Sequence, residues 1–298
     1  MFFTVLIYLL LIVTAFLFSY TLYFPSLALS YRIGAIDVPN ARKMHSFPIA
    51  RGGGLAFFVA FSVLLALSHV NYELKISLLL GGATIFLVGF LDDTVSLSPF
   101  QKLAGQFGAA AVFIFTSGNK TLVEGVFTFA WIMYLSNAIN LTDGLNGLAG
   151  GICASESLCL AVISLIFGNF EVLLCSLLLL GATLGFLPRN FPHAKIFMGD
   201  CGALFLGFIL AALSSHLVFE SGSIVCLLAI LLVFRVPTYD TNLSIIRRLI
   251  KRKNPFKADK GHFHHHLLRW GFSKECATLA LITVSLFFGL VGIVIASL

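Results

Sequence analysis

Charged residues are scarce in this chain. Only 11% of its 298 residues are Asp, Glu, Lys or Arg, whereas 59% are hydrophobic and the mean hydropathy is +1.00. A soluble domain could not bury that much apolar surface, so this composition indicates a protein that crosses a membrane several times. No stretch long enough for a soluble domain separates the apolar runs. We therefore expect one integral-membrane domain over residues 1–298.

Two other features are missing from the sequence. The six cysteines lie in or beside apolar runs and have no CxxC spacing, which argues against a zinc site and against a disulfide framework. No basic residue precedes the first apolar run, which covers residues 2–24. This run is too long for the core of a signal peptide, so we expect it to remain as a membrane helix.

The apolar runs predict an all-α polytopic bundle with about ten transmembrane helices. A helix needs about 20 apolar residues to span the hydrocarbon core of a bilayer. The predicted spans are residues 2–27, 54–70, 76–91, 103–117, 122–139, 148–166, 171–187, 201–219, 222–236 and 276–297.

The distribution of Lys and Arg predicts the orientation of these spans. If alternate loops are assigned to opposite sides, only Lys75 and Lys120 fall on one side and the remaining 17 of 19 basic residues fall on the other. Basic loops stay in the cytoplasm, so we expect both termini in the periplasm. All seven aspartates then lie on the cytoplasmic side, and the outer loops contain glutamates only.

This one-sided placement of acids separates two classes of function. A transporter needs polar groups near the bilayer midplane, whereas an enzyme with a cytosolic substrate needs them at one face. The only acid well inside a predicted span is Glu156, and whether it faces a cleft or is paired within the bundle stays open. The pattern favours an enzyme.

Five motifs occur in a fixed order along the chain. They are DVPN (37–40) followed by Arg42, His45, Pro48 and RGG (51–53); GFLDD (89–93); NAINLTDGLNGLA (137–149); FMGDCG (197–202); and DKGHFHH (259–265). Together they resemble the polyprenyl-phosphate N-acetylhexosamine-1-phosphate transferases. The HxHHxL pattern (262–267) is closer to the branch that uses UDP-GlcNAc or UDP-GalNAc than to the branch that uses UDP-MurNAc-pentapeptide.

The resemblance implies a reaction and its partners. Such an enzyme moves a sugar-1-phosphate from a UDP-N-acetylhexosamine to undecaprenyl phosphate at the cytoplasmic face of the bacterial inner membrane and releases UMP. This step starts a lipid-linked cell-envelope glycan such as O-antigen or teichoic acid. The expected cofactor is Mg²⁺, with Mn²⁺ as the alternative. The expected surroundings are the lipid bilayer, with a homodimer as an open option and no nucleic-acid partner.

The first two aspartates, Asp92 and Asp93, end an apolar run. Adjacent carboxylates can hold a hard cation or a metal-bound phosphate, so both are predicted as catalytic residues and metal ligands. Solvation of a helix end is the alternative, although the helix dipole disfavours anions there. The third acid of a prenyl-diphosphate DDxxD box is missing. For Asp200 the resemblance implies a Mg²⁺ ligand, and a helix N-cap is the alternative.

The glycine-rich segment 137–151 allows close backbone approach to a nucleotide, or tight helix packing. The resemblance places nucleotide recognition at Asp143, which is also predicted as catalytic, and Asn146 stands where the family usually has a second aspartate. The predicted substrate-binding residues are His45, Arg51, Lys102, Asn137, Asn140 and Asp143.

A histidine cluster lies in the basic segment 237–275, which is predicted as a cytoplasmic loop. His262, His264 and His265 are predicted as catalytic residues that donate hydrogen bonds to a diphosphate, whereas His266 falls outside the pattern. Zinc binding is the alternative. Residues 242–253 alternate apolar and basic side chains and predict an interfacial helix, unless their charge serves topology alone.

The predicted mechanism is one phosphoryl transfer, in which Asp200 with Asp92 or Asp93 holds the metal and the lipid phosphate attacks the phosphorus next to the sugar. The attacking phosphate is already largely dianionic near neutrality, since its second pKa is about 6, so a positioning role for Asp92 is favoured over a base. A covalent aspartyl intermediate is the alternative. The rival functions are phospho-MurNAc-pentapeptide transfer, transport of polyprenyl-linked sugars and CDP-alcohol phosphotransfer.

Overall fold

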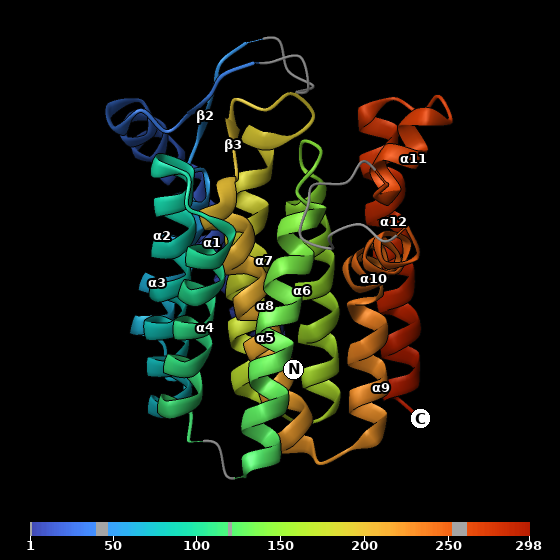
Figure 1. Cartoon of the computed structure of the whole chain (residues 1–298). Coiled ribbons are helices and arrows are strands. Elements are labelled where there is room, and N and C mark those ends of the chain that lie inside the picture. The colour runs from blue at the N-terminus through green and yellow to red at the C-terminus, as the bar shows by residue number, and fades with distance from the viewer. Residues whose placement is uncertain (1, 40–46, 119–120, 252–260) are drawn as a thin grey trace.

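The computed structural model describes residues 2–39, 47–118, 121–251 and 261–298. This part of the chain forms a long bundle of helices with a few short strands at one end (Figure 1). The elements are α1 (Phe2–Ile33), β1 (Ile36–Asp37), β2 (Ile49–Arg51), α2 (Gly54–Leu67), α3 (Tyr72–Val95), α4 (Pro99–Thr116), α5 (Leu122–Thr142), α6 (Leu148–Ile166), α7 (Phe170–Asn190), β3 (Ile196–Phe197), α8 (Gly199–Ser221), α9 (Ile224–Val233), α10 (Arg235–Ile250), α11 (Phe263–Arg269) and α12 (Lys274–Ala296).

The structure confirms an all-α polytopic membrane protein. Among the described residues, seven helices are long and apolar enough to cross a bilayer: α1, α3, α5, α6, α7, α8 and α12. The pair α9 and α10 adds an eighth if the two are counted as one broken span. Helix α2 has only 14 residues. Nine of the ten predicted apolar segments each coincide with one helix, but the count of ten spans and the periplasmic termini stay predictions.

The predicted span 222–236 differs from the structure in one respect. Helix α9 ends at Val233, and the chain then bends by 72° into α10. The predicted helix over residues 242–253 is confirmed as far as Ile250, as the second half of α10. The segment 237–275, predicted as a loop, contains most of α10 and the whole of α11 in its described part.

Helix α8 forms the centre of the bundle. Most of its residues are buried, and it packs against α3 and α5. Close contact with α5 depends on Gly207, where an added Cβ would lie 2.6 Å from the Cα of Ser136. Phe205 packs edge-on against Phe58 and Phe61 of α2. The start of α8 lies against the end of α3 at Gly89, where an added Cβ would be 2.5 Å from the backbone of Cys201.

A small three-stranded sheet, which the sequence did not predict, covers one end of the bundle. Strand β1 pairs antiparallel with β2, and β2 pairs parallel with β3, so that Arg51 lies opposite Phe197. The sheet therefore joins the motif at 51–53 to the motif at 197–202. Gly54 makes this junction tight, because a Cβ there would lie 2.5 Å from the backbone of Gly202.

The alternating direction of the helices brings distant motifs to the same end of the molecule. The ends of α3 and α5, the start of α8, the strands and α11 all lie at one end of the bundle (Figure 1). The start of α1 and the end of α12 lie toward the other end. As predicted, Asp92, Asp93, Asp143 and Asp200 therefore share one end; which side of the membrane that end faces stays a prediction.

Candidate active site

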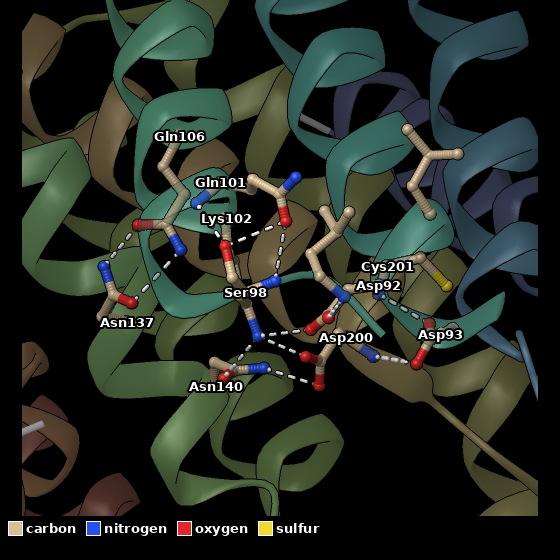
Figure 2. Close-up of polar contacts among 12 residues, drawn as sticks. Asp92, Asp93, Ser98, Gln101, Lys102, Gln106, Asn137, Asn140, Asp200 and Cys201 are labelled. Atoms are coloured by element: carbon tan, nitrogen blue, oxygen red, sulfur yellow. Dashed lines mark hydrogen bonds and ion pairs between the residues drawn. The ribbon is translucent and has the colours of Figure 1, made fainter. Parts of the chain in front are cut away.

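Asp93 caps a helix other than its own. Its buried carboxylate accepts hydrogen bonds from the backbone N–H groups of Asp200 (2.9 Å) and Cys201 (3.0 Å), the first turn of α8 (Figure 2). A helix N-terminus has unpaired amides and a positive dipole end, so a buried anion stabilises it. Gly199 has φ +76°, and a Cβ there would overlap the Asp93 carboxylate. The capping role that was the alternative for Asp200 is thus supplied by Asp93.

Lys102 lies between two of the predicted carboxylates. Its Nζ is 3.1 Å from Oδ2 of Asp92 and forms a closer ion pair with Asp200 (Figure 2). Asn140 joins the same cluster, since its Nδ2 donates to Oδ1 of Asp200 at 3.1 Å and its Oδ1 is 3.4 Å from Nζ of Lys102. The other oxygen of Asp92 accepts from the N–H of Leu97 at 2.8 Å. Oxygen atoms from α3, α5 and α8 therefore converge on one cation.

Asn137 lies deeper in the bundle than Asn140. Its side-chain amide pairs with that of Gln106 on α4 through two hydrogen bonds, of 2.6 and 3.2 Å (Figure 2). It also donates to the carbonyl of Met133. This exchange satisfies both amides within the protein. Asn137 does not line the cavity that opens beside Asp200 and Asn140, and its predicted role in substrate binding stays a prediction.

A cavity of about 390 Å³ opens beside this cluster. Its polar lining comes from strands, helix ends and α11: Asp37, Arg51, Asn140, Asp143, Asn146, Asn190, Asp200, His264, His265 and Lys274. Six predicted site residues thus meet at one cavity: Arg51, Asn140, Asp143, Asp200, His264 and His265. Asp92, Asp93, Lys102, Asn137 and His262 do not line it, although Asp92 and Lys102 are joined to it through Asp200.

Besides Asn146, three polar lining residues had no assigned role at the level of sequence. Asp37 belongs to a recognised motif, and it forms an ion pair with Arg51, Nε to Oδ1 3.3 Å. Asn190 ends α7, and its Oδ1 accepts from the N–H of Gly147 at 2.7 Å. Lys274 begins α12 and lies in no motif, so no local signal could have identified it. His45 and Asp259 lie outside the described residues.

Asp143 caps the end of α5 and contributes a carboxyl group to the cavity. Burial and the charges of Asp200 and Asp93, opposed by the charge of Arg51, together raise its pKa to about 7. Near neutral pH this carboxyl can therefore be present as the acid or as the carboxylate. As the acid it can donate a hydrogen bond, which an ionised carboxylate cannot do.

The three predicted histidines differ in position. His264 is buried, lines the cavity and lies so close to Gly144 that a Cβ there would overlap its ring. Burial, with smaller contributions from His265 and His262, lowers the pKa of His264 to about 4, so this imidazole is neutral near pH 7. His262 instead bonds to Asp240, Nδ1 to Oδ2 2.9 Å. These placements divide the cluster into two lining residues and one supporting residue.

The oxygen donors at the cluster suit a hard divalent cation. Carboxylate and amide oxygens are the ligands that Mg²⁺ and Mn²⁺ prefer, and those of Asp92, Asp200 and Asn140 already surround the Lys102 ammonium. Both oxygens of the third predicted ligand, Asp93, accept amides of α8. Within the described ranges, no group of three or more His, Cys, Asp or Glu side chains is arranged to hold a metal ion.

Comparison with known proteins gives consistent matches over most of the chain. Residues 75–218 match the family described as glycosyl transferase family 4. The chain is 34% identical over 284 residues to a probable undecaprenyl-phosphate N-acetylglucosaminyl 1-phosphate transferase of Bacillus subtilis, covering 90% of this chain and 79% of that protein.

Two further relatives are named for transferases that act on different sugars. An undecaprenyl-phosphate alpha-N-acetylglucosaminyl 1-phosphate transferase of Thermotoga maritima is 33% identical over 263 residues, covering 87% of this chain and 81% of the relative. A phospho-N-acetylmuramoyl-pentapeptide-transferase of Staphylococcus aureus is 32% identical over 272 residues, covering 81% of this chain and 83% of the relative.

Proposed function

The chain belongs to glycosyl transferase family 4, and we propose that it transfers an N-acetylhexosamine 1-phosphate, with N-acetylglucosamine as the favoured sugar, from a UDP-sugar to undecaprenyl phosphate. One observation carries this proposal: the cavity where Asp143, Asp200, Arg51 and His264 meet lies at a helix-bundle end, beside the Asp92–Lys102 pair. That place lets a soluble nucleotide and a membrane lipid reach the same groups.

The residues of this chain would position two phosphates rather than supply a base. An oxygen of the lipid phosphate attacks the phosphorus attached to the sugar, the bond from that phosphorus to the UMP oxygen breaks, and UMP leaves with the electron pair. Catalysis of this kind depends mainly on alignment and on neutralisation of charge. Arg51 and Lys102 supply fixed positive charge, and His264 and His265 supply ring N–H donors.

Asp92 and Asp200, with Asn140, would hold Mg²⁺, which supplies positive charge to the diphosphate. Asp92 is fitted to positioning, because one of its oxygens accepts the N–H of Leu97 and the other faces Lys102. A nucleophilic role, as a covalent intermediate requires, would have to break one of these contacts. The geometry therefore favours a single displacement.

We place the site on the cytoplasmic side of a bacterial inner membrane, because 17 of the 19 basic residues fall on the side of the motifs. Single cysteines in the segment 92–101, beside Asp143 and beside Asp200, in a background without the six native cysteines, test this placement. We expect labelling only by a reagent that enters the cell. Labelling by an impermeant reagent from outside would reverse the orientation.

The reaction is tested by incubating the purified protein with undecaprenyl phosphate, Mg²⁺ and, separately, UDP-GlcNAc, UDP-GalNAc and UDP-MurNAc-pentapeptide, and by measuring UMP. We expect UMP release with UDP-GlcNAc that depends on the lipid phosphate. Release only with UDP-MurNAc-pentapeptide would assign the second activity, which the Staphylococcus aureus relative represents. No release with any of the three would refute the proposal.

A further inference from the structure

Helix α10 holds the short segment that leads into α11 at two points. Asp240 accepts a hydrogen bond from Nδ1 of His262 (2.9 Å) with one oxygen and from the backbone N–H of Phe263 (2.9 Å) with the other. Further along α10, Arg247 donates a hydrogen bond to the carbonyl of Gly261 at 2.8 Å. The side chains of Asp240 and His262 are only 7% and 6% exposed.

The contacts with Asp240 replace a side-chain N-cap, which α11 lacks. His262 is the N-cap residue of α11, yet its side chain makes no cap hydrogen bond to the helix. Helices as short as the seven residues of α11 are not stable alone in water, so their direction depends on contacts from outside. The Asp240 carboxylate satisfies the first amide of α11 and fixes the ring of the residue that precedes it.

The direction of α11 determines where His264 lies. His264 is the second residue of the helix, and its buried ring fits against Gly144 and lines the cavity. The rings of His262 and His264 are nearly parallel, 3° apart in plane with centroids 5.9 Å apart. A change in the position of His262 would therefore shift the adjacent His264 ring. Asp240 itself is not a lining residue of the cavity.

We propose that Asp240 is a positioning residue for the transfer reaction, which acts by holding His262 and the first amide of α11 so that His264 reaches the diphosphate. The inference rests on the proposed function. It also explains why the histidine pattern contains a member that does not line the cavity: His262 is bonded to Asp240 and serves the position of His264.

The expected size of the effect follows from the bonds that are lost. Asp240→Ala removes an acceptor from His262 and from the amide of Phe263. Losing a charge-assisted hydrogen bond at this kind of site lowers kcat/KM by about 10- to 100-fold. Asp240→Asn keeps an oxygen that can accept from Phe263, so we expect a smaller loss.

A double-mutant cycle separates positioning from a general structural role. Wild-type protein is first shown to release UMP with UDP-GlcNAc; failure there counts against the proposed function and not against the positioning role. Then kcat and KM are measured for Asp240→Ala, His264→Ala and the double variant. Because Asp240 acts through His264, the double variant should equal His264→Ala, and both single variants should show the same division between kcat and KM.

The matched control lies on the same helix. Asn242 accepts a hydrogen bond from the hydroxyl of Tyr134 at 2.8 Å and has no contact with α11 among the bonds described, so Asn242→Ala should keep activity within about 2-fold. Independent, multiplying losses in the double variant, or a loss for Asp240→Ala no larger than for Asn242→Ala, would overturn the inference. If Asp240→Ala does not fold, the cycle is run with Asp240→Asn and judged by the same criteria.

Discussion

Removal of the Asp93 carboxylate is expected to destabilise the start of α8 more than it disturbs any metal site. Asp93→Ala leaves the amides of Asp200 and Cys201 without their acceptor in a buried place. Loss of a helix cap costs about 0.5 to 2 kcal/mol, and loss of a hydrogen bond to a charged group costs about 1.5 to 3 kcal/mol. Part of this cost is offset, because the Asp93 carboxylate lies at the C-terminal end of α3, where the helix dipole disfavours an anion. We therefore expect a loss of about 2 to 4 kcal/mol.

Thermal unfolding in detergent measures this loss. For a chain of this size, 1 kcal/mol corresponds to roughly 2 °C in Tm, so Asp93→Ala should lower Tm by about 4 to 8 °C. Asp92→Ala is the matched control, since Asp92 accepts one backbone amide and Lys102 keeps Asp200 as its partner. We expect it to lose activity with a Tm change under about 2 °C. An unchanged Tm for Asp93→Ala, together with a higher Mg²⁺ requirement, would refute the cap and make Asp93 a metal ligand.

Three further predictions concern the cavity. Asp200→Asn should raise the Mg²⁺ concentration needed for half-maximal activity; an unchanged requirement removes Asp200 from the metal site. His264→Ala and His265→Ala should each lower kcat/KM by about 10- to 150-fold. His266→Ala should lower it much less, because the His266 ring contacts Gly261 and Arg269 instead of the cavity. Zinc that co-purifies in a 1:1 ratio and disappears in the variants would instead establish a metal site. The folded-state pKa of Asp143, about 7, lies above its unfolded value of about 3.9. This carboxyl therefore stabilises the fold below about pH 4, and that contribution is lost as pH rises to about 7. Between pH 5 and 8 without metal, the Tm of wild type should fall relative to that of Asp143→Asn; parallel Tm curves would contradict the shift.

Hydropathy and charge placement predicted most of the architecture because each acts locally. An apolar run long enough to span the bilayer has to become a helix, since a membrane leaves no other partner for its backbone groups. The same runs placed Asp92, Asp143 and Asp200 at helix ends, and alternation of direction brought these ends together. The bend at Phe234 escaped prediction, because a single Arg235 does not end the apolar run 222–236 and because α10 is held across the bundle by contacts such as that between Tyr134 and Thr238.

The roles of neighbouring residues could not be separated by sequence, because they depend on contacts between distant segments. Asp92 and Asp93 are adjacent and chemically identical, yet one faces Lys102 and the other caps a helix that begins more than 100 residues later. His262 and His264 belong to one motif, yet His264 lines the cavity whereas His262 bonds to Asp240 of α10. The short strands that carry Arg51 to the cavity have two or three residues each and leave no periodic signal.

The most direct test of the central claim follows the sugar and the nucleotide together. Purified protein is supplied with undecaprenyl phosphate, Mg²⁺ and UDP-GlcNAc labelled in the sugar and in the phosphorus attached to it. We predict that both labels enter one lipid-soluble product, in equal amounts, with one UMP released for each lipid formed, and that Asp200→Asn abolishes this. Release of UDP with transfer of the sugar label alone would contradict phosphoryl transfer and the account built on this cavity.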